Sequence, residues 1–111
     1  MKSCIFCDII SKKLKAQIIY EDDEFLAFED THPRAPVHFL VIPKAHIETI
    51  LIANEQTLGR LLTIAAQEAK NKGLEVDGFR TVINCNRHGG QTVYHLHLHV
   101  LGGRWFSWPP G

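Results

Sequence analysis

The chain has no excess of charge of either sign, because 12 lysines and arginines balance 12 aspartates and glutamates among its 111 residues. A chain without net charge produces no long-range field that gathers nucleic acid or an anionic membrane surface. We therefore expect neither as a partner, and a nucleotide would have to be held by local donors. The N-terminal apolar run at residues 4–10 is interrupted by Asp8 and does not approach the length of a signal peptide or a membrane span. We expect a cytoplasmic protein.

Cysteine is also scarce. The three cysteines, Cys4, Cys7 and Cys85, are an odd number, which argues against a disulfide framework and leaves metal binding, redox chemistry or burial as free thiols. The sequence contains no internal repeat, low-complexity segment or linker. A chain of this length can bury a core of its own, so we expect a single domain over residues 1–111.

Residue periodicity predicts a sheet combined with helices. Apolar runs bounded by turn residues predict strands at 18–21, 25–29, 38–43 and 80–84, and the run at 38–43 is apolar enough to be buried on both faces. A long helix is predicted over 54–72, with Asn54 as N-cap and Gly73 as the stop. A short helix is predicted from Cys4 to about Lys13. The long helix has apolar residues at the spacing of one covered face, namely Leu58, Leu61, Leu62, Ala65, Ala66 and Ala69.

Three histidines at two-residue spacing, His95, His97 and His99, alternate with aliphatic residues. This alternation predicts a strand with all three imidazoles on one face. Side chains on one face of a strand are about 6.6 Å apart, so neighbouring rings can share a ligand. The alternative is the solvated face of an antiparallel sheet, but such a face rarely uses one titratable residue type three times. The row favours an elongated polar substrate or a metal.

The residues before this strand, Gly89, Gly90, Gln91 and Thr92, predict an anion-binding loop. Glycine allows the backbone to adopt positive φ, and the N–H groups of such a loop can converge on an anion. A phosphate cradle that leads directly into a histidine row indicates phosphoryl chemistry.

The run from His95 to Leu101, H-L-H-L-H-V-L, resembles the motif of the histidine triad (HIT) superfamily. Its flanks, T-V-Y before it and L-G-G-R and W-P-P-G after it, are similar to those of the HINT-like branch of purine nucleoside phosphoramidases. The resemblance implies an α+β HIT-like fold with a five-stranded antiparallel sheet, one long helix and short helices. It also implies a homodimer across which the sheet extends, with the tail at 102–111 near the dimer and active-site region.

The activity that the resemblance implies is hydrolysis of the P–N bond of nucleoside 5′-phosphoramidates, such as AMP joined through nitrogen to lysine or another amine. His97 attacks the α-phosphorus and forms a covalent nucleotidyl-histidine, which water then cleaves; His95, His99 and His38 are the other catalytic histidines. An imidazole is neutral and nucleophilic near pH 7 provided that its other nitrogen donates to a fixed acceptor, such as a main-chain carbonyl. No catalytic metal is required.

Three alternatives remain open. In the first, the chain is a nucleotide-binding regulatory module with incidental hydrolysis. In the second, it is a dinucleoside polyphosphate hydrolase or nucleotidyl transferase of the same superfamily. In the third, the histidine row is itself a catalytic metal centre.

The resemblance also implies a nucleotide site for AMP or GMP conjugates. Asp30 accepts hydrogen bonds from the ribose hydroxyls, and Thr31 stands where the family usually has isoleucine. N–H groups around Gln91 and Thr92 meet charge that builds on the phosphoryl oxygens. The full set of expected nucleotide contacts is Phe6, Ile9, Phe28, Asp30, Thr31, Asn84, Gly90, Gln91, Thr92 and Trp108.

Cys4 and Cys7 form a Cys-x-x-Cys pair, which can supply half of a zinc site. His46 and His95 would complete a closed tetrahedral Cys2His2 site of structural type for Zn²⁺. Zinc-bearing HIT proteins are similar at these positions, whereas close relatives replace the cysteines and need no metal. Buried free thiols are the alternative. If zinc is bound, His95 cannot also relay a proton, and it orients His97 instead.

Overall fold

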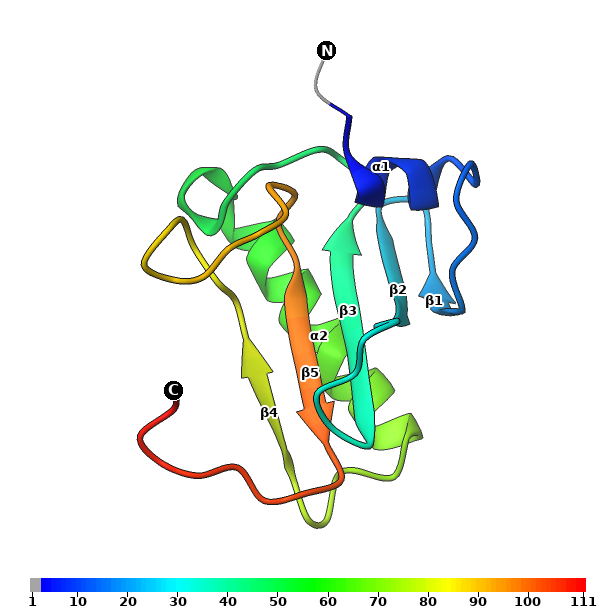
Figure 1. Ribbon diagram of the computed structural model, residues 1–111. Coiled ribbons are helices and arrows are strands. Elements are labelled where there is room, and N and C mark those ends of the chain that lie inside the picture. Colours follow the sequence, from blue (N-terminus) through cyan, green and yellow to red (C-terminus); the bar gives the residue numbers. More distant parts are fainter. Residues whose placement is uncertain (1–2) are drawn as a thin grey trace.

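The computed structural model describes residues 3–111. It contains one five-stranded antiparallel sheet in the order β1-β2-β3-β5-β4, with the long helix α2 across one face and the short helix α1 at the other (Figure 1). The predicted α+β class is therefore confirmed. The elements in chain order are α1 (Ile5–Ile10), β1 (Ile18–Glu21), β2 (Phe25–Glu29), β3 (Val37–Pro43), the 3-10 helix η1 (Ile50–Ile52), α2 (Glu55–Asn71), β4 (Phe79–Val82) and β5 (Leu98–Gly102).

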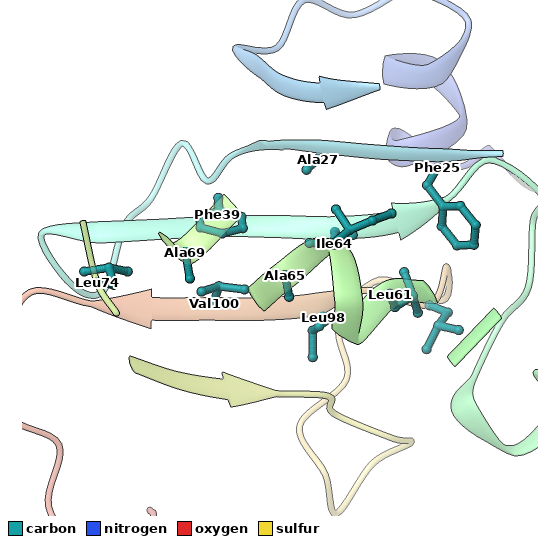
Figure 2. Close-up of a cluster of buried hydrophobic side chains, with 12 residues drawn as sticks. Phe25, Ala27, Phe39, Leu61, Ile64, Ala65, Ala69, Leu74, Leu98 and Val100 are labelled. Carbon is teal, nitrogen blue, oxygen red and sulfur yellow. The ribbon is translucent and has the colours of Figure 1, made fainter. Parts of the chain in front are cut away.

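The larger core lies between the sheet and α2. Alternate residues of β2 and β3, such as Ala27 and Phe39, point toward the helix and meet Ile64 and Ala65 (Figure 2). The other residues of the same strands point to the opposite face, where they form a second cluster with α1. From His38 to Pro43, β3 is buried, because both of its faces are covered; the prediction of a doubly buried strand is confirmed.

Helix α2 begins as predicted, because the Asn54 side chain accepts a hydrogen bond from the Thr57 N–H at 2.8 Å. Its buried face differs from the prediction. Leu62 is 48% exposed and Ala66 is also exposed, whereas Ile64 and Glu68 are buried. The spacing of leucines and alanines is compatible with two neighbouring faces of the helix and does not distinguish them. The sheet covers the face that contains Leu61, Ile64, Ala65, Glu68 and Ala69.

Two elements end earlier than predicted. Helix α1 ends at Ile10, because Lys12 has φ of +67° and the Lys13 N–H returns to the Asp8 carbonyl. Strand β4 ends at Val82, where its pairing with β5 stops opposite His99.

The histidine strand is shorter than predicted. Strand β5 begins at Leu98, so only His99 of the three histidines lies in it, and the prediction of a strand through His95 and His97 is wrong. The ladder between β3 and β5 ends at Val41 and Leu98, and beyond it the Pro43 carbonyl is bound by the His95 ring instead of a strand N–H.

None of the helices formed by residues 3–111 is long and apolar enough to cross a membrane.

Candidate active site

Four histidines lie together on the sheet face that α2 does not cover. His99 comes from β5 and His38 from the neighbouring β3, while His97 and His95 lie on the segment just before β5. The rings of His97 and His99 have centroids 5.0 Å apart, and those of His38 and His99 are 5.2 Å apart. His38, His95 and His97 are buried. The alternative of a solvated sheet face is therefore wrong.

His97 has one ring nitrogen fixed and one free. Its Nδ1 lies 2.7 Å from the His95 carbonyl oxygen, which can only accept, so Nδ1 carries the proton and Nε2 keeps a lone pair. Burial lowers the pKa of His97, although the bond to the His95 carbonyl and the charge of Asp30 raise it. The edge of the ring contacts Phe6, with centroids 5.1 Å apart. This imidazole is neutral near pH 7 and has the electronic form of a nucleophile.

His38 and His99 form a directed hydrogen bond. The Arg34 backbone N–H donates to His38 Nδ1 at 3.0 Å, so the neutral His38 ring carries its proton on Nε2. That Nε2 lies 2.9 Å from His99 Nδ1 and donates to it, which leaves His99 with an Nε2–H. Burial, followed by the neighbouring His97 and His38, lowers the pKa of His99 to about 4. His99 therefore presents a neutral N–H donor near His97.

His95 faces away from the other two triad histidines. Its Nε2 donates to the Pro43 carbonyl at 2.8 Å, so Nδ1 has a free lone pair. Nδ1 lies 3.2 Å from His46 Nδ1, 3.4 Å from Cys4 Sγ and 3.7 Å from Cys7 Sγ.

These four residues fit a zinc site. One ligand atom from each of Cys4, Cys7, His46 and His95 lies within 4.8 Å of the others, and two thiolates with two imidazoles are a structural zinc set. The tautomer of His95 leaves the required nitrogen unprotonated. Burial and the neighbouring Cys4 raise the pKa of the Cys7 thiol to about 11, and a bound metal would overcome this by replacing the proton. The structure thus brings together every residue of the predicted metal set.

A second group of possible ligands contains Asp30, His38 and His99. It fits a metal poorly, because His38 Nε2 carries the proton that it donates to His99. Within residues 3–111, the three triad histidines do not form such a group among themselves. The geometry therefore does not support the alternative of a three-histidine catalytic metal centre.

The glycine loop is held by the buried side chain of Gln91. Its Oε1 accepts from the Asn86 N–H at 2.9 Å, and its Nε2 donates to the carbonyls of Glu48 at 2.8 Å and Val93 at 3.0 Å. The Gln91 backbone N–H is also paired, with the Asn86 carbonyl. Thr92 is exposed, and its N–H and hydroxyl have no protein partner among residues 3–111. Within residues 3–111, the donors of this loop without a partner are the N–H of Gly89 and the N–H and hydroxyl of Thr92, while Gln91 shapes the loop.

Gly89 and Gly90 are required by the loop backbone. A Cβ at Gly89 would lie 2.4 Å from the Cys85 carbonyl oxygen, and Gly90 has φ of +76°.

The residues expected around the base are largely internal. Phe6, Ile9 and Phe28 are at most 7% exposed and pack with the β2 and β3 residues below α1. The rings of Phe6 and Phe28 meet edge to face at 5.5 Å. Thr31 is exposed, and Asn84 is half-buried just beyond β4. Of these side chains, Phe6 packs edge to face against His95 and His97, so the cluster below α1 adjoins the histidines.

The C-terminal tail lies away from the histidines of its own chain. It leaves the C-terminal end of β5 and turns back beside β4, whereas His97 precedes the other end of β5 (Figure 1). Phe106 packs against Arg104 and Arg80, whose guanidinium carbons lie 4.2 and 5.3 Å from the ring centroid. Trp108 is 80% exposed, so in a single chain it does not reach the site.

The sequence suggested a main-chain carbonyl as the partner of His97, but it could not identify which backbone groups orient the rings. Arg34 lies in a loop whose side chains indicate only surface, yet its N–H fixes the tautomer of His38. In the same way, the Pro43 carbonyl fixes the tautomer of His95, and the His95 carbonyl fixes the tautomer of His97. Backbone groups carry no residue-type signal, so only the fold reveals them.

The family model of the HIT domain matches residues 11–105. The purine nucleoside phosphoramidase of Escherichia coli is 48% identical over 103 residues, covering 90% of this chain and 87% of that protein. Among solved structures, a HIT family hydrolase from Legionella pneumophila superposes with a TM-score of 0.94 at 46% identity, covering 98% of this chain and all of that one. A zinc-bound histidine triad protein from Mycobacterium smegmatis superposes with a TM-score of 0.83 at 37% identity, covering 92% of this chain and 76% of that one.

With the family model matched over most of its length and the triad assembled on the expected sheet, the chain belongs to the HIT domain family.

Proposed function

We propose that this HIT-family hydrolase cleaves the P–N bond of nucleoside 5′-phosphoramidates through a covalent nucleotidyl group on His97. The observation that carries the proposal is the fixed tautomer of His97, whose Nδ1 is held by the His95 carbonyl at 2.7 Å. The ring therefore keeps a free Nε2 lone pair, as a nucleophile requires. The similarity to the phosphoramidase of Escherichia coli favours a purine nucleotide, AMP or GMP, as the phosphoryl portion of the substrate.

In the first step, His97 Nε2 forms a bond to the α-phosphorus and the P–N bond breaks. The leaving amine takes up a proton from water, and the nucleotidyl-imidazolium keeps its Nδ1–H on the His95 carbonyl. In the second step, water attacks the same phosphorus, the bond to Nε2 breaks, and the water proton passes to solvent or to the departed amine. Two displacements give overall retention of configuration at phosphorus.

Donors around His97 stabilise charge on the phosphoryl oxygens. His99 Nε2–H is available, because its Nδ1 accepts from His38. The N–H and hydroxyl of Thr92 and the N–H of Gly89 are unpaired donors of the glycine loop, and Gln91 holds the loop in place. In this proposal Gly90 and Asn84 also contact the phosphoryl group. Fixed donors of this kind stabilise a transition state without reorganisation.

The nucleoside lies along α1 and the end of β2. Asp30 accepts from the ribose hydroxyls, the edges of Phe6, Ile9 and Phe28 contact the base, and Thr31 lies beside it.

Zinc would be held by Cys4, Cys7, His46 and His95. When bound, it supplies a cross-link between α1, the segment after β3 and the segment before β5, with no part in the chemical steps. His95 then acts through its carbonyl, which holds His97.

A second copy of the chain completes the molecule in this proposal. Strand β4 is an edge of the sheet, and Val76, Phe79 and Trp105 near it are exposed to solvent at 90%, 38% and 97%. Pairing along β4 would extend the sheet, cover these residues and bring Trp108 toward the partner's site.

Three free thiols fit a reducing compartment such as the cytoplasm.

The test uses adenosine 5′-phosphoramidate with a fluorescent amine as the leaving group. The wild-type protein should gain the mass of one nucleotidyl group after a rapid quench, and turnover should persist in chelator. His97→Ala should lose both the adduct and turnover, by at least about a thousandfold, while it still binds AMP. The matched control is His88→Ala, which removes an exposed histidine.

Turnover by His97→Ala within about tenfold of wild type would remove His97 as the nucleophile. Turnover that disappears with the metal would move the chemistry to a metal centre. Nucleotide binding without turnover would favour the regulatory module. Faster cleavage of a dinucleoside polyphosphate than of the phosphoramidate would favour a dinucleoside polyphosphate hydrolase.

A further inference from the structure

Asp30 has one carboxylate oxygen fixed and one available. Oδ1 accepts from the His32 N–H at 2.8 Å, and the Asp30 N–H donates to the His38 carbonyl at 3.0 Å. These two bonds fix the side chain so that Oδ2 lies 3.4 Å from His38 Nε2. The side chain of Asp30 is 19% exposed, so part of the carboxylate is accessible from outside.

The His38 Nε2–H has one hydrogen-bond acceptor, His99 Nδ1, and one carboxylate oxygen nearby, Asp30 Oδ2. Arg34 donates to Nδ1, so Nε2 carries the only ring proton of neutral His38. His99 Nδ1 lies at 2.9 Å and Asp30 Oδ2 at 3.4 Å from Nε2. A carboxylate charge at this distance attracts the same proton and weakens its bond to His99. The strength of the His38–His99 bond thus depends on how strongly Asp30 attracts the same proton.

Asp30 also acts on the site through its charge. Burial lowers the pKa values of His38 and His99, and for both of them Asp30 is the carboxylate that opposes this effect. A hydroxyl that donates to Oδ2 would satisfy part of the carboxylate charge and reduce its attraction for His38.

We propose that Asp30 is a positioning residue that couples recognition of the vicinal ribose hydroxyls to the state of His99. This inference rests on the proposed function. When the hydroxyls donate to Oδ2, the attraction of the carboxylate for the His38 Nε2–H falls and the bond from Nε2–H to His99 Nδ1 strengthens. The stronger bond holds His99 more firmly in the tautomer with Nε2–H that it already has, and this Nε2–H donates to the phosphoryl oxygen in the transition state. The ribose hydroxyls therefore accelerate the chemical step in addition to increasing affinity.

The test compares two substrates that differ only in the ribose. An adenosine 5′-phosphoramidate and its 2′,3′-dideoxy counterpart, with the same fluorescent amine, are each mixed with excess protein, and the rate at saturation is separated from the half-saturating concentration. In the wild type we expect the saturating rate to fall about tenfold for the dideoxy substrate, the effect of about one hydrogen bond on the barrier. A pure ribose clamp would change only the half-saturating concentration.

The variant Asp30→Asn removes the competing charge and keeps an oxygen for the His32 N–H. We expect its two saturating rates to agree within about twofold, while its half-saturating concentration for the ribose substrate rises. The matched control is Asp23→Asn, which removes an exposed carboxylate from the turn between β1 and β2 and should keep the wild-type ratio. If the ratio persists in Asp30→Asn, the coupling is overturned.

A measurement on the wild type alone gives an independent check. In a long-range proton–nitrogen spectrum, AMP should shift the His38 Nε2–H resonance and 2′,3′-dideoxy-AMP at saturation should leave it in place. Equal shifts with both nucleotides, or equal saturating rates with both substrates, would overturn the coupling and leave the phosphoramidase proposal standing. Absence of turnover of either substrate would overturn the proposed function and the coupling with it.

Discussion

At the scale of single residues, backbone groups determine what each histidine can do. Three rings of the site are fixed at one nitrogen by the main chain: His97 by the His95 carbonyl, His95 by the Pro43 carbonyl and His38 by the Arg34 N–H. The remaining nitrogen therefore has a free lone pair in His97 and His95, and carries the ring proton in His38. Identical side chains only two residues apart, His95 and His97, thus acquire different chemistry, because their main-chain partners differ.

The depressed pKa of His99 predicts a dependence of stability on pH. An unfolded chain takes up a proton on this ring near pH 6.5, whereas the native ring does so at about 4. Between these values the unfolded state binds more protons, so the free energy of unfolding falls as the pH falls. His99→Gln should reduce this slope by up to about 1.4 kcal/mol per pH unit.

Urea denaturation at about pH 7 and about pH 4.5 measures the slope. His88→Gln, at an exposed position, should keep the wild-type slope. An unchanged slope in His99→Gln would mean that the ring titrates normally in the native state.

At the scale of elements, the sequence predicted which segments form strands and helices better than where they end. The alternation at 95–100 is a strand pattern, but the strand needs a partner, and β3 pairs with β5 only as far as Val41 and Leu98. The ends of α1 and β4 depend likewise on single backbone conformations and on pairing partners. The predicted N-cap at Asn54 was confirmed because it depends on local contacts alone.

The conformation of the loop before β5 depends on a single side chain, that of Gln91. Gln91→Ala would leave the Asn86 N–H and the carbonyls of Glu48 and Val93 without their partner. We expect it to cost about 1–3 kcal/mol, to increase amide hydrogen exchange at residues 86–93 and to lower the rate of turnover, because Thr92 loses its position. Gln67→Ala, on the exposed side of α2, is the control. Slow turnover with unchanged exchange in the loop would instead indicate that Gln91 contacts the substrate directly.

At the scale of the whole molecule, the triad histidines and the predicted Cys/His metal set lie close together because two clusters cover opposite faces of one sheet. Helix α2 closes the larger core and leaves the other face to α1 and the histidines. The zinc set and the triad could be predicted from residue types and from the family resemblance. The stripe of α2 that is buried could not, because Leu61 and Leu62 are equivalent in sequence and only the position of the sheet distinguishes them.

The different burial of Leu61 and Leu62 predicts different effects of their substitution. Leu61 is fully buried, so Leu61→Ala should lower the free energy of unfolding by about 2–5 kcal/mol, at any protein concentration. Leu62 is 48% exposed, and Leu62→Ala in the monomer should cost less than about 1 kcal/mol. Urea denaturation at two protein concentrations separates the stability of the single chain from the stability that comes from association with a second copy, because only the latter increases with concentration. A cost for Leu62→Ala that grows with concentration would place Leu62 under the partner. A cost equal to that of Leu61→Ala at the lower concentration would mean that α2 buries the stripe that its leucines and alanines first predicted.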